Sequence, residues 1–264
     1  MRVTCVQFDI AWQDKPANFA KVRTLLAGAN ACEAGGLIVL PEMFSTGFSM
    51  DVQSAAEGLP APAEGFLAEF ARRYGCYALG GVVNTASDGR GLNEAVLIGP
   101  AGRHLMRYAK MHPFSYAGES EHFAPGEAPV VAEIAGTSLS PFICYDLRFP
   151  EVFRAASLAG AEVLVVISNW PASRSEHFHA LLTARAIENQ AWVVGVNRVG
   201  SDPNVRYSGG SVVIDPFGRT VADAGDGETV LSTEMDVQAL RQYRQEFPVL
   251  ADARCGWVRR LDRS

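Results

Sequence analysis

The sequence lacks the features that mark a secreted, membrane-spanning or metal-dependent protein. Its five cysteines are scattered, and no two have the short spacing of a zinc site or of a redox-active CxxC pair. No uninterrupted apolar run reaches the roughly 18 residues that a membrane-spanning helix requires. The chain opens on a strand-like segment, residues 3–8, instead of a charged leader followed by an apolar core. We therefore expect a cytoplasmic protein with reduced thiols, no membrane contact, and no metal or other cofactor.

Positive charge is also scarce. The 23 lysines and arginines are outnumbered by 29 acidic residues, which gives a net charge of -6. Nucleic-acid binding needs a basic surface, so we expect no nucleic-acid partner. The chain does have length: 264 residues with 48% hydrophobic content can bury a sizeable core without disulfides or metal. Because no glycine-rich linker interrupts it, we predict a single domain over residues 1–264.

Short apolar runs alternate with amphipathic segments along the chain, which is typical of an α/β protein. Because the runs are apolar on both faces, they predict sheets that are covered by helices. We expect strands over residues 3–8, 37–40, 77–84, 93–98, 103–109, 138–144, 162–168 and 192–198, and helices over residues 15–33, 63–74, 176–190 and from Phe149–Pro150 onward.

One turn occurs twice. Residues 96–103 and 212–219 each consist of an apolar run that ends in a Pro-x-Gly-Arg turn, and each predicts a β-hairpin. The recurrence suggests two similarly built halves that pack face to face. The alternative is that this tetrapeptide is simply a favourable turn, and both interpretations stay open at this stage.

Cys144 is the first candidate for chemistry. It ends an apolar strand and precedes a helix that opens near Pro150. A strand-to-helix bend exposes a side chain and offers backbone N–H groups to a developing oxyanion. A helix N-terminus and a nearby cation would also lower the pKa of the thiol. A lone cysteine in a strand is more often a buried structural residue, so the hypothesis depends on its neighbours.

Two charged residues also lie at strand ends. Glu42 closes the apolar strand 37–40, and Lys110 follows the hairpin strand 103–109. Sites in open α/β folds form at the carboxyl ends of strands, where such groups can converge. A carboxylate could take the thiol proton and an ammonium could hold an oxyanion. Alone, the glutamate could be a loop cap and the lysine a solvated edge charge.

Three segments make the sequence recognisable. Residues 40–48, 108–112 and 143–151 resemble the signature segments of the nitrilase (carbon–nitrogen hydrolase) superfamily, in the order Glu, Lys, Cys. The resemblance extends from residue 1 to about residue 235. Within the superfamily, residues 110–119 and 169–190 are similar to the ω-amidase branch.

The resemblance implies a four-layer αββα sandwich of two mixed sheets flanked by helices. It also implies a homodimer that forms through a helical face. The C-terminal segment, about residues 236–264, is expected to pack at the dimer interface, although its basic residues could equally be loose.

The resemblance further implies a mechanism. Glu42 would act as general base toward Cys144 and then as acid toward departing ammonia. Lys110 and the backbone N–H of Tyr145 would stabilise the oxyanion, and a thioester acyl-enzyme would form on the cysteine.

The family's second glutamate positions the lysine and the substrate amide. It falls on Glu119 when Pro125–Gly126 is used as the anchor, and Glu121 is the competing assignment.

The ω-amidase resemblance implies a short acid with a distal primary amide, such as 2-oxoglutaramate or 2-oxosuccinamate. An arginine fork fits its carboxylate best, and Arg174 is the candidate, although it could be a surface arginine at a helix start. Phe48 and Trp170 would form apolar walls. The same three catalytic residues also serve deaminated glutathione, N-carbamoyl amino acids and nitriles in the superfamily. An inactive binding protein on this fold is a further alternative.

Other polar residues have plainer interpretations. His177 and His179 are two residues apart on a predicted helix, so they do not share a face and no metal site is expected. His112 is expected to stabilise its loop, and Asp146 and Arg148 to form local ion pairs and helix-start contacts.

Overall fold

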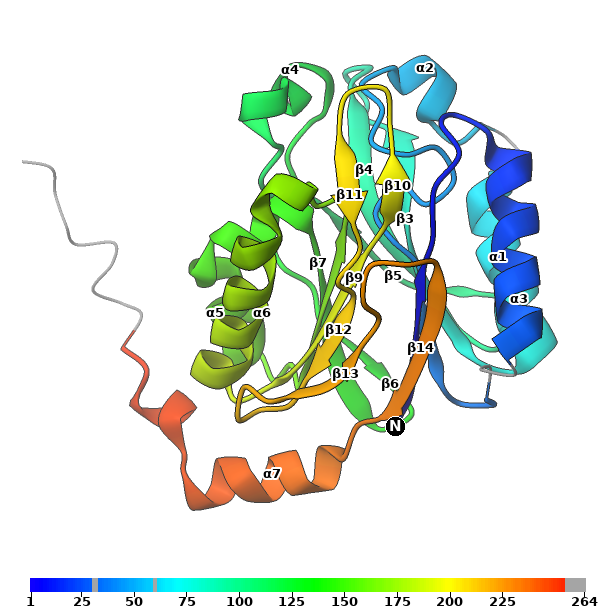
Figure 1. Ribbon diagram of the computed structural model, residues 1–264. Coiled ribbons are helices and arrows are strands. Elements are labelled where there is room, and N and C mark those ends of the chain that lie inside the picture. Colours follow the sequence, from blue (N-terminus) through cyan, green and yellow to red (C-terminus); the bar gives the residue numbers. More distant parts are fainter. Residues whose placement is uncertain (30–32, 59–60, 255–264) are drawn as a thin grey trace, which may run out of the picture.

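The computed structural model describes residues 1–29, 33–58 and 61–254 (Figure 1). Two six-stranded mixed sheets lie face to face, and helices cover the outer face of each sheet. This is the predicted four-layer αββα sandwich. A two-stranded sheet stands at one end of the sandwich.

The strands of the first sheet are, in spatial order, β14 (Thr229–Glu234), β1 (Arg2–Gln7), β2 (Leu37–Val39), β3 (Tyr77–Thr85), β4 (Gly91–Ile98) and β5 (His104–Ala109). Those of the second are β13 (Thr220–Asp223), β12 (Val212–Ile214), β9 (Trp192–Asn197), β8 (Val163–Ser168), β7 (Thr137–Ile143) and β6 (Ala132–Ile134). The small sheet pairs β10 (Val199–Ser201) with β11 (Arg206–Ser208).

The α-helices are α1 (Lys15–Ala29), α2 (Val52–Ala55), α3 (Pro62–Tyr74), α4 (Glu119–His122), α5 (Pro150–Leu158), α6 (Ser175–Asn189) and α7 (Val237–Glu246). Short 3-10 turns are η1 (Ser115–Ala117), η2 (Cys144–Arg148), η3 (Ala172–Arg174) and η4 (Val249–Asp252).

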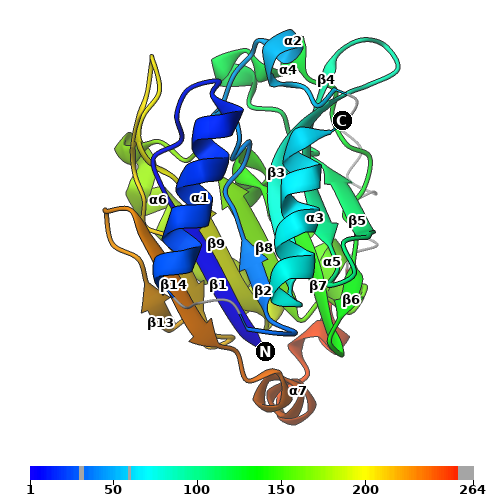
Figure 2. The same cartoon turned by 90° about the vertical axis from the view of Figure 1, so that its right-hand side faces the viewer.

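Apolar side chains fill both spaces that the layers create. In β2, Leu37 and Val39 join the cluster that packs the two sheets together, whereas Ile38 joins a second cluster on the other face of the sheet. Figure 2 shows α1 and α3 lying over that outer face of the first sheet. The period-2 alternation of a strand thus sends side chains into two different apolar layers. This explains why the inner strands are apolar throughout.

The two halves of the chain have the same strand plan, which confirms the face-to-face interpretation of the repeated turn. In the first half β1, β2 and β3 run parallel and β4 and β5 follow antiparallel. In the second half β7, β8 and β9 run parallel and β12 and β13 follow antiparallel. The two Pro-x-Gly-Arg turns also close alike, with Gly102 N–H donating to Gly99 O (2.8 Å) and Gly218 N–H to Asp215 O (2.9 Å).

Several element boundaries differ from the sequence prediction. The helix expected over residues 15–33 ends at Ala29 in the described residues; residues 30–32 lie outside them, and Glu33 is not helical. The sequence pattern did not reveal α2, β6, α4, β10, β11, β14 or α7. Most of these are short or largely exposed, so they carry little hydrophobic periodicity.

The C-terminal helix α7 packs on its own chain. Arg244 donates from Nε to Gln190 O (2.8 Å) and from Nη2 to Ala161 O (2.8 Å), while Arg241 Nε donates to Glu162 Oε1 (2.6 Å). Residues 255–264, which end the segment expected at a dimer interface, lie outside the described residues. Within the described ranges, no helix combines the length and apolar character that crossing a membrane requires.

Candidate active site

Cys144 lies at the bend between β7 and η2, as predicted. Its backbone φ is +47°, in the left-handed region that residues other than glycine rarely adopt. The side chain is nearly buried, at 8% exposure, and lines an open pocket with about 750 Å³ of empty space. Such a strained bend persists only where surrounding contacts hold it, and it is a common feature of functional sites.

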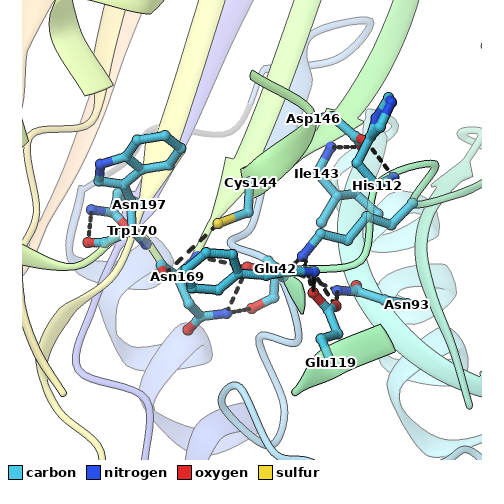
Figure 3. Close-up of polar contacts among 12 residues, drawn as sticks. Glu42, Asn93, His112, Glu119, Ile143, Cys144, Asp146, Asn169, Trp170 and Asn197 are labelled. Carbon is cyan, nitrogen blue, oxygen red and sulfur yellow. Dashed lines mark hydrogen bonds and ion pairs between the residues drawn. The ribbon is translucent and has the colours of Figure 1, made fainter. Parts of the chain in front are cut away.

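Asp146 supplies those contacts. Its buried carboxylate accepts hydrogen bonds from Ile143 N–H (3.0 Å), Tyr108 OH (2.8 Å) and His112 N–H (2.9 Å), and it pairs with His112 Nδ1 (2.8 Å) (Figure 3). The expected helix-start contact is therefore present. The side chain that pairs with Asp146 is that of His112, from a segment far away in the sequence.

Arg148 does not form the local ion pair that we expected. No carboxylate partner of Arg148 occurs among the described residues; its guanidinium lies over the ring of Trp170 at 4.9 Å and approaches His177 Nδ1 (3.4 Å). Arg148 instead lines the pocket that Cys144 also lines.

Glu42, Lys110 and Glu119 form a buried charged cluster. Lys110 Nζ donates to Glu42 Oε1 (3.0 Å) and to Glu119 Oε2 (2.7 Å), and all three side chains are at most 1% exposed. Glu42 follows β2, Lys110 follows β5, and Glu119 opens α4, so three separate elements deliver the cluster (Figure 3). Buried charges of this kind are tolerated only when they are paired and hydrogen-bonded.

The alternative assignment, Glu121, lies elsewhere. Its side chain is exposed, whereas Glu119 is fully buried and also accepts a hydrogen bond from Phe114 N–H. Glu119 is therefore the glutamate that contacts Lys110.

Two asparagines that the sequence analysis did not single out complete the hydrogen bonding. Asn93 Nδ2 donates to both carboxylates, at 2.7 Å to Glu42 Oε1 and 2.9 Å to Glu119 Oε1. Asn169 donates from its backbone N–H to Glu42 Oε2 (2.8 Å) and from Nδ2 to Glu42 O (2.8 Å). The available signal was a polar residue within or directly after an apolar strand, where burial obliges it to find a partner.

The electrostatic setting of Cys144 differs from our expectation. Burial and the nearby Glu42 carboxylate raise the pKa of the thiol well above its usual value, and Lys110 only partly opposes them. The expected lowering of this pKa is therefore wrong, because desolvation of the thiolate outweighs the cation. The thiol proton is directed at a backbone carbonyl, with Sγ 3.9 Å from Asn169 O.

Lys110 remains a cation although it is buried. Burial alone would lower its pKa, but the charges of Glu119 and Glu42 raise it above the usual value. The pKa of Glu119 is itself raised, by burial and by the charge of Glu42, against the opposing effect of Lys110. The arrangement can thus hold one cation beside a neutral thiol and two acidic groups, which suits proton transfer and oxyanion stabilisation.

The residues expected to bind substrate all line the pocket. Phe48 and Trp170 form apolar walls near Cys144, and the Phe48 ring centroid lies 5.3 Å from Lys110 Nζ. Arg174 lines the same pocket, and its carbonyl accepts from Trp170 Nε1 (2.7 Å). Tyr145 lines it beside the cysteine.

No cluster of three or more metal-ligating side chains occurs in the described part of the chain.

The fold and the site together define a class of protein. The profile of the carbon–nitrogen hydrolase family matches residues 2–245, and the chain belongs to this family. It is therefore a hydrolase that acts on carbon–nitrogen bonds, and its relatives support amide hydrolysis.

Individual relatives are similar over nearly their whole length. The chain is 40% identical to the omega-amidase YafV of Escherichia coli strain K12 over 256 residues, covering 96% of each chain. It is 32% identical to the 2-oxoglutaramate amidase of Bacillus subtilis, covering 96% of this chain and 97% of that one. The crystal structure of XC1258 from Xanthomonas campestris, a CN-hydrolase superfamily protein with an arsenic adduct in the active site, superposes with a TM-score of 0.89. It is 31% identical, and the match covers 96% of this chain and 97% of that chain.

Proposed function

We propose that this protein is an ω-amidase. It hydrolyses the distal primary amide of a small 2-oxo dicarboxylic acid monoamide, such as 2-oxoglutaramate or 2-oxosuccinamate, to the acid and ammonia. The observation that carries the proposal is the buried Lys110, which is paired with both Glu42 and Glu119. Beside this cluster, Cys144 lines a pocket that arginines also line. The similarity to relatives named omega-amidase and 2-oxoglutaramate amidase supports it.

The first half-reaction forms a thioester. Glu42 takes the thiol proton as Cys144 Sγ attacks the amide carbon, and Lys110 and the Tyr145 N–H stabilise the oxyanion. One such donor is typically worth about 3 kcal/mol. Glu42 then passes the proton to the departing nitrogen, the carbon–nitrogen bond breaks, and ammonia leaves. Glu119 keeps Lys110 oriented and aligns the substrate amide.

The second half-reaction releases the acid. Glu42 takes a proton from water as the water oxygen adds to the thioester carbon, and Lys110 again stabilises the oxyanion. Collapse of this intermediate breaks the carbon–sulfur bond, and the proton on Glu42 returns to the sulfur of Cys144. Water and the chain's own residues supply every atom and proton of this cycle.

The substrate carboxylate needs a cation, and two arginines line the pocket. We propose that Arg174 pairs with this carboxylate, and Arg148 is a second guanidinium within the same pocket. An arginine fork matches a carboxylate better than a lysine does. Phe48 and Trp170 would pack against the carbon chain.

The catalytic proposal predicts that Cys144→Ala abolishes ammonia release from 2-oxoglutaramate. Cys5→Ala is the matched control, since Cys5 is a fully buried thiol whose pKa burial raises to about 12. Retained turnover by folded Cys144→Ala would exclude the mechanism.

The substrate assignment is tested with a panel that also contains deaminated glutathione, an N-carbamoyl amino acid and a nitrile. Cleavage of one of these while 2-oxoglutaramate stays intact would identify another C–N hydrolase of the superfamily. Arg174→Gln should raise KM for 2-oxoglutaramate more than KM for a neutral amide.

We also propose a cytoplasmic homodimer. A reducing compartment would keep Cys144 a thiol.

The dimer proposal rests on an apolar surface patch where α6, the turn before β13 and α7 meet. The patch consists of Ile187, Phe217, Tyr243 and Phe247, of which Phe217 and Phe247 are 53% and 58% exposed. Exposed patches of this kind commonly mark protein interfaces. Light scattering at micromolar protein should give twice the chain mass, and Phe217→Asp should shift the assembly toward monomer. A wild-type monomer would contradict the proposal.

A further inference from the structure

A second hollow adjoins the catalytic pocket. This outer vestibule has about 700 Å³ of empty space and is lined by Tyr116, Ser173 and Arg206, which do not line the pocket itself. It shares Phe114 and Arg174 with the pocket, so the two spaces lie side by side. A molecule bound at Cys144 can therefore extend into the vestibule.

The vestibule is positively charged. Arg174 and Arg206 both line it, and no carboxylate does so in the part of the chain that the structure describes. Neither guanidinium has a carboxylate partner among the described residues. Arg174 instead lies over two aromatic rings, 5.9 Å from the Phe114 centroid and 5.5 Å from the Tyr116 centroid. Two arginines without carboxylate partners that line one hollow favour an anionic ligand.

A backbone contact joins the two segments that carry Arg174 and Arg206. An isolated β-bridge joins Pro171, just before η3 with Arg174, to Tyr207, next to Arg206 on β11. The bridge means that β11 is not a bare sheet edge, so edge protection does not explain Arg206.

The nearest acidic residue on this hairpin does not neutralise the arginines. Asp202 accepts hydrogen bonds from Asn204 N–H (2.7 Å), Val205 N–H (2.7 Å) and Tyr207 OH, and so stabilises its own turn.

We propose that the outer vestibule is a second anion subsite. It takes the distal carboxylate of an elongated amide substrate, one that is longer than a five-carbon 2-oxo acid. Arg206 pairs with that carboxylate, together with Arg174 at the boundary, and the exposed ring of Tyr116 covers the carbon chain. The distal carboxylate can belong to the acyl part or to the amine part of the amide. This inference rests on the proposed amidase function and extends its substrate class.

The test compares amides that differ in length and charge. Succinamate is the short anionic substrate, suberamate carries a distal carboxylate on its acyl part, and N-acetyl-6-aminohexanoate carries one on its amine part. Octanamide matches suberamate in length without the charge. Each is assayed with the wild type, with Arg206→Gln, and with Arg103→Gln. Arg103 is an exposed arginine before β5, at the opposite end of that strand from Lys110, and so serves as the matched control.

For at least one of the two long anionic amides, Arg206→Gln should lower the ratio of its kcat/KM to that of succinamate about three- to fivefold. This is the size expected for a partly exposed charge pair, and the effect should shrink at high salt. Whichever amide responds identifies the part of the substrate that reaches the vestibule. Octanamide should show no such change, and Arg103→Gln should match the wild type. Unchanged ratios for both long anionic amides would overturn the proposal.

A second measurement needs no turnover. Suberate should protect Cys144 from iodoacetamide better than succinate does, and Arg206→Gln should weaken protection by suberate by a similar factor. If no amide is cleaved but this protection depends on Arg206, the amidase assignment fails while the anion subsite stands. If protection by suberate is the same in both proteins, the subsite fails independently of the activity.

Discussion

Opposing charges act on the pKa of the Cys144 thiol. Glu42 and burial disfavour its thiolate, whereas Lys110 favours it, and burial with Glu42 prevails. In the proposed mechanism the thiol of Cys144 is therefore neutral at rest, and its attack would need a base that removes the proton as the bond forms. This differs from a cysteine that is pre-ionised by a helix N-terminus.

These opposing effects predict that replacing Glu42 makes the thiol of Cys144 easier to ionise but lowers the activity. Glu42→Gln removes a negative charge next to the sulfur, so the pKa of Cys144 should fall. Activity should nevertheless drop by about 10²–10⁴-fold, because the proposed general base is lost. The pH dependence of iodoacetamide alkylation reports the pKa, and ammonia release reports activity. Glu121→Gln is the control, since Glu121 is exposed and has no contact with Lys110. An increase in the pKa of Cys144 in Glu42→Gln would refute this account.

The side chain of Asp146 joins the ends of several secondary-structure elements. The carboxylate ties the start of η2, through Ile143, to the end of β5, through Tyr108, and to the segment after Lys110, through His112. Cys144 and Lys110 follow β7 and β5, which are strands of different sheets. We therefore propose that Asp146 is a positioning residue that sets the spacing between Cys144 and Lys110.

Asp146→Asn should leave one acceptor where the native residue has two. We expect a loss of about 2 kcal/mol of unfolding free energy, typical of a buried charge-assisted hydrogen bond. We also expect kcat to fall roughly 10- to 100-fold with little change in KM, because misplaced catalytic groups slow chemistry more than binding. Asp223→Asn, on an exposed stretch of β13, is the control and should change stability by less than about 0.5 kcal/mol. Loss of stability with normal kcat would limit Asp146 to a structural role.

At the scale of the whole molecule, contacts between distant segments join the layers. β14 pairs with β1, and the amino group of Met1 donates to Met235 O (2.8 Å). The largest apolar cluster takes side chains from both sheets. We therefore propose that the chain folds as a single domain, so thermal unfolding should show one transition.

The pair between α7 and Glu162 predicts how that transition depends on pH. Burial acts to raise the pKa of Glu162, but hydrogen bonds from Arg241 and Ser138 N–H lower it further, so the net pKa lies below the usual value. Because the pKa of Glu162 is lower in the folded chain than in the unfolded chain, where it is about 4.3, ionised Glu162 stabilises the fold above that pH. This stabilisation is lost as the pH falls through the pKa of the folded state. Glu162→Gln should therefore cost about 1 kcal/mol at neutral pH and progressively less below about pH 4. A difference that stays constant down to pH 3 would contradict the assignment.

Patterns among neighbouring residues in the sequence were enough to predict much of the secondary structure and the candidate catalytic groups. Apolar runs and turn residues predicted most strands and the two matching hairpins, because strand periodicity and turn preferences are properties of neighbouring residues. The strand-end positions and signature segments of Glu42, Lys110 and Cys144 identified the candidate catalytic groups. One-turn or three-residue elements such as α4, β10 and β11 left too little pattern to detect.

Only the tertiary structure decided the rest, because it depends on contacts between residues far apart in the chain. Burial distinguished Glu119 from Glu121, and it brought Asn93 and Asn169 onto the carboxylate of Glu42. It also reversed the expected direction of the Cys144 pKa, since desolvation and the charge of Glu42 arise only once three strand ends meet. The sequence by itself singled out Cys144 as the candidate nucleophile, but the pKa of its thiol is set by the neighbours that folding assembles.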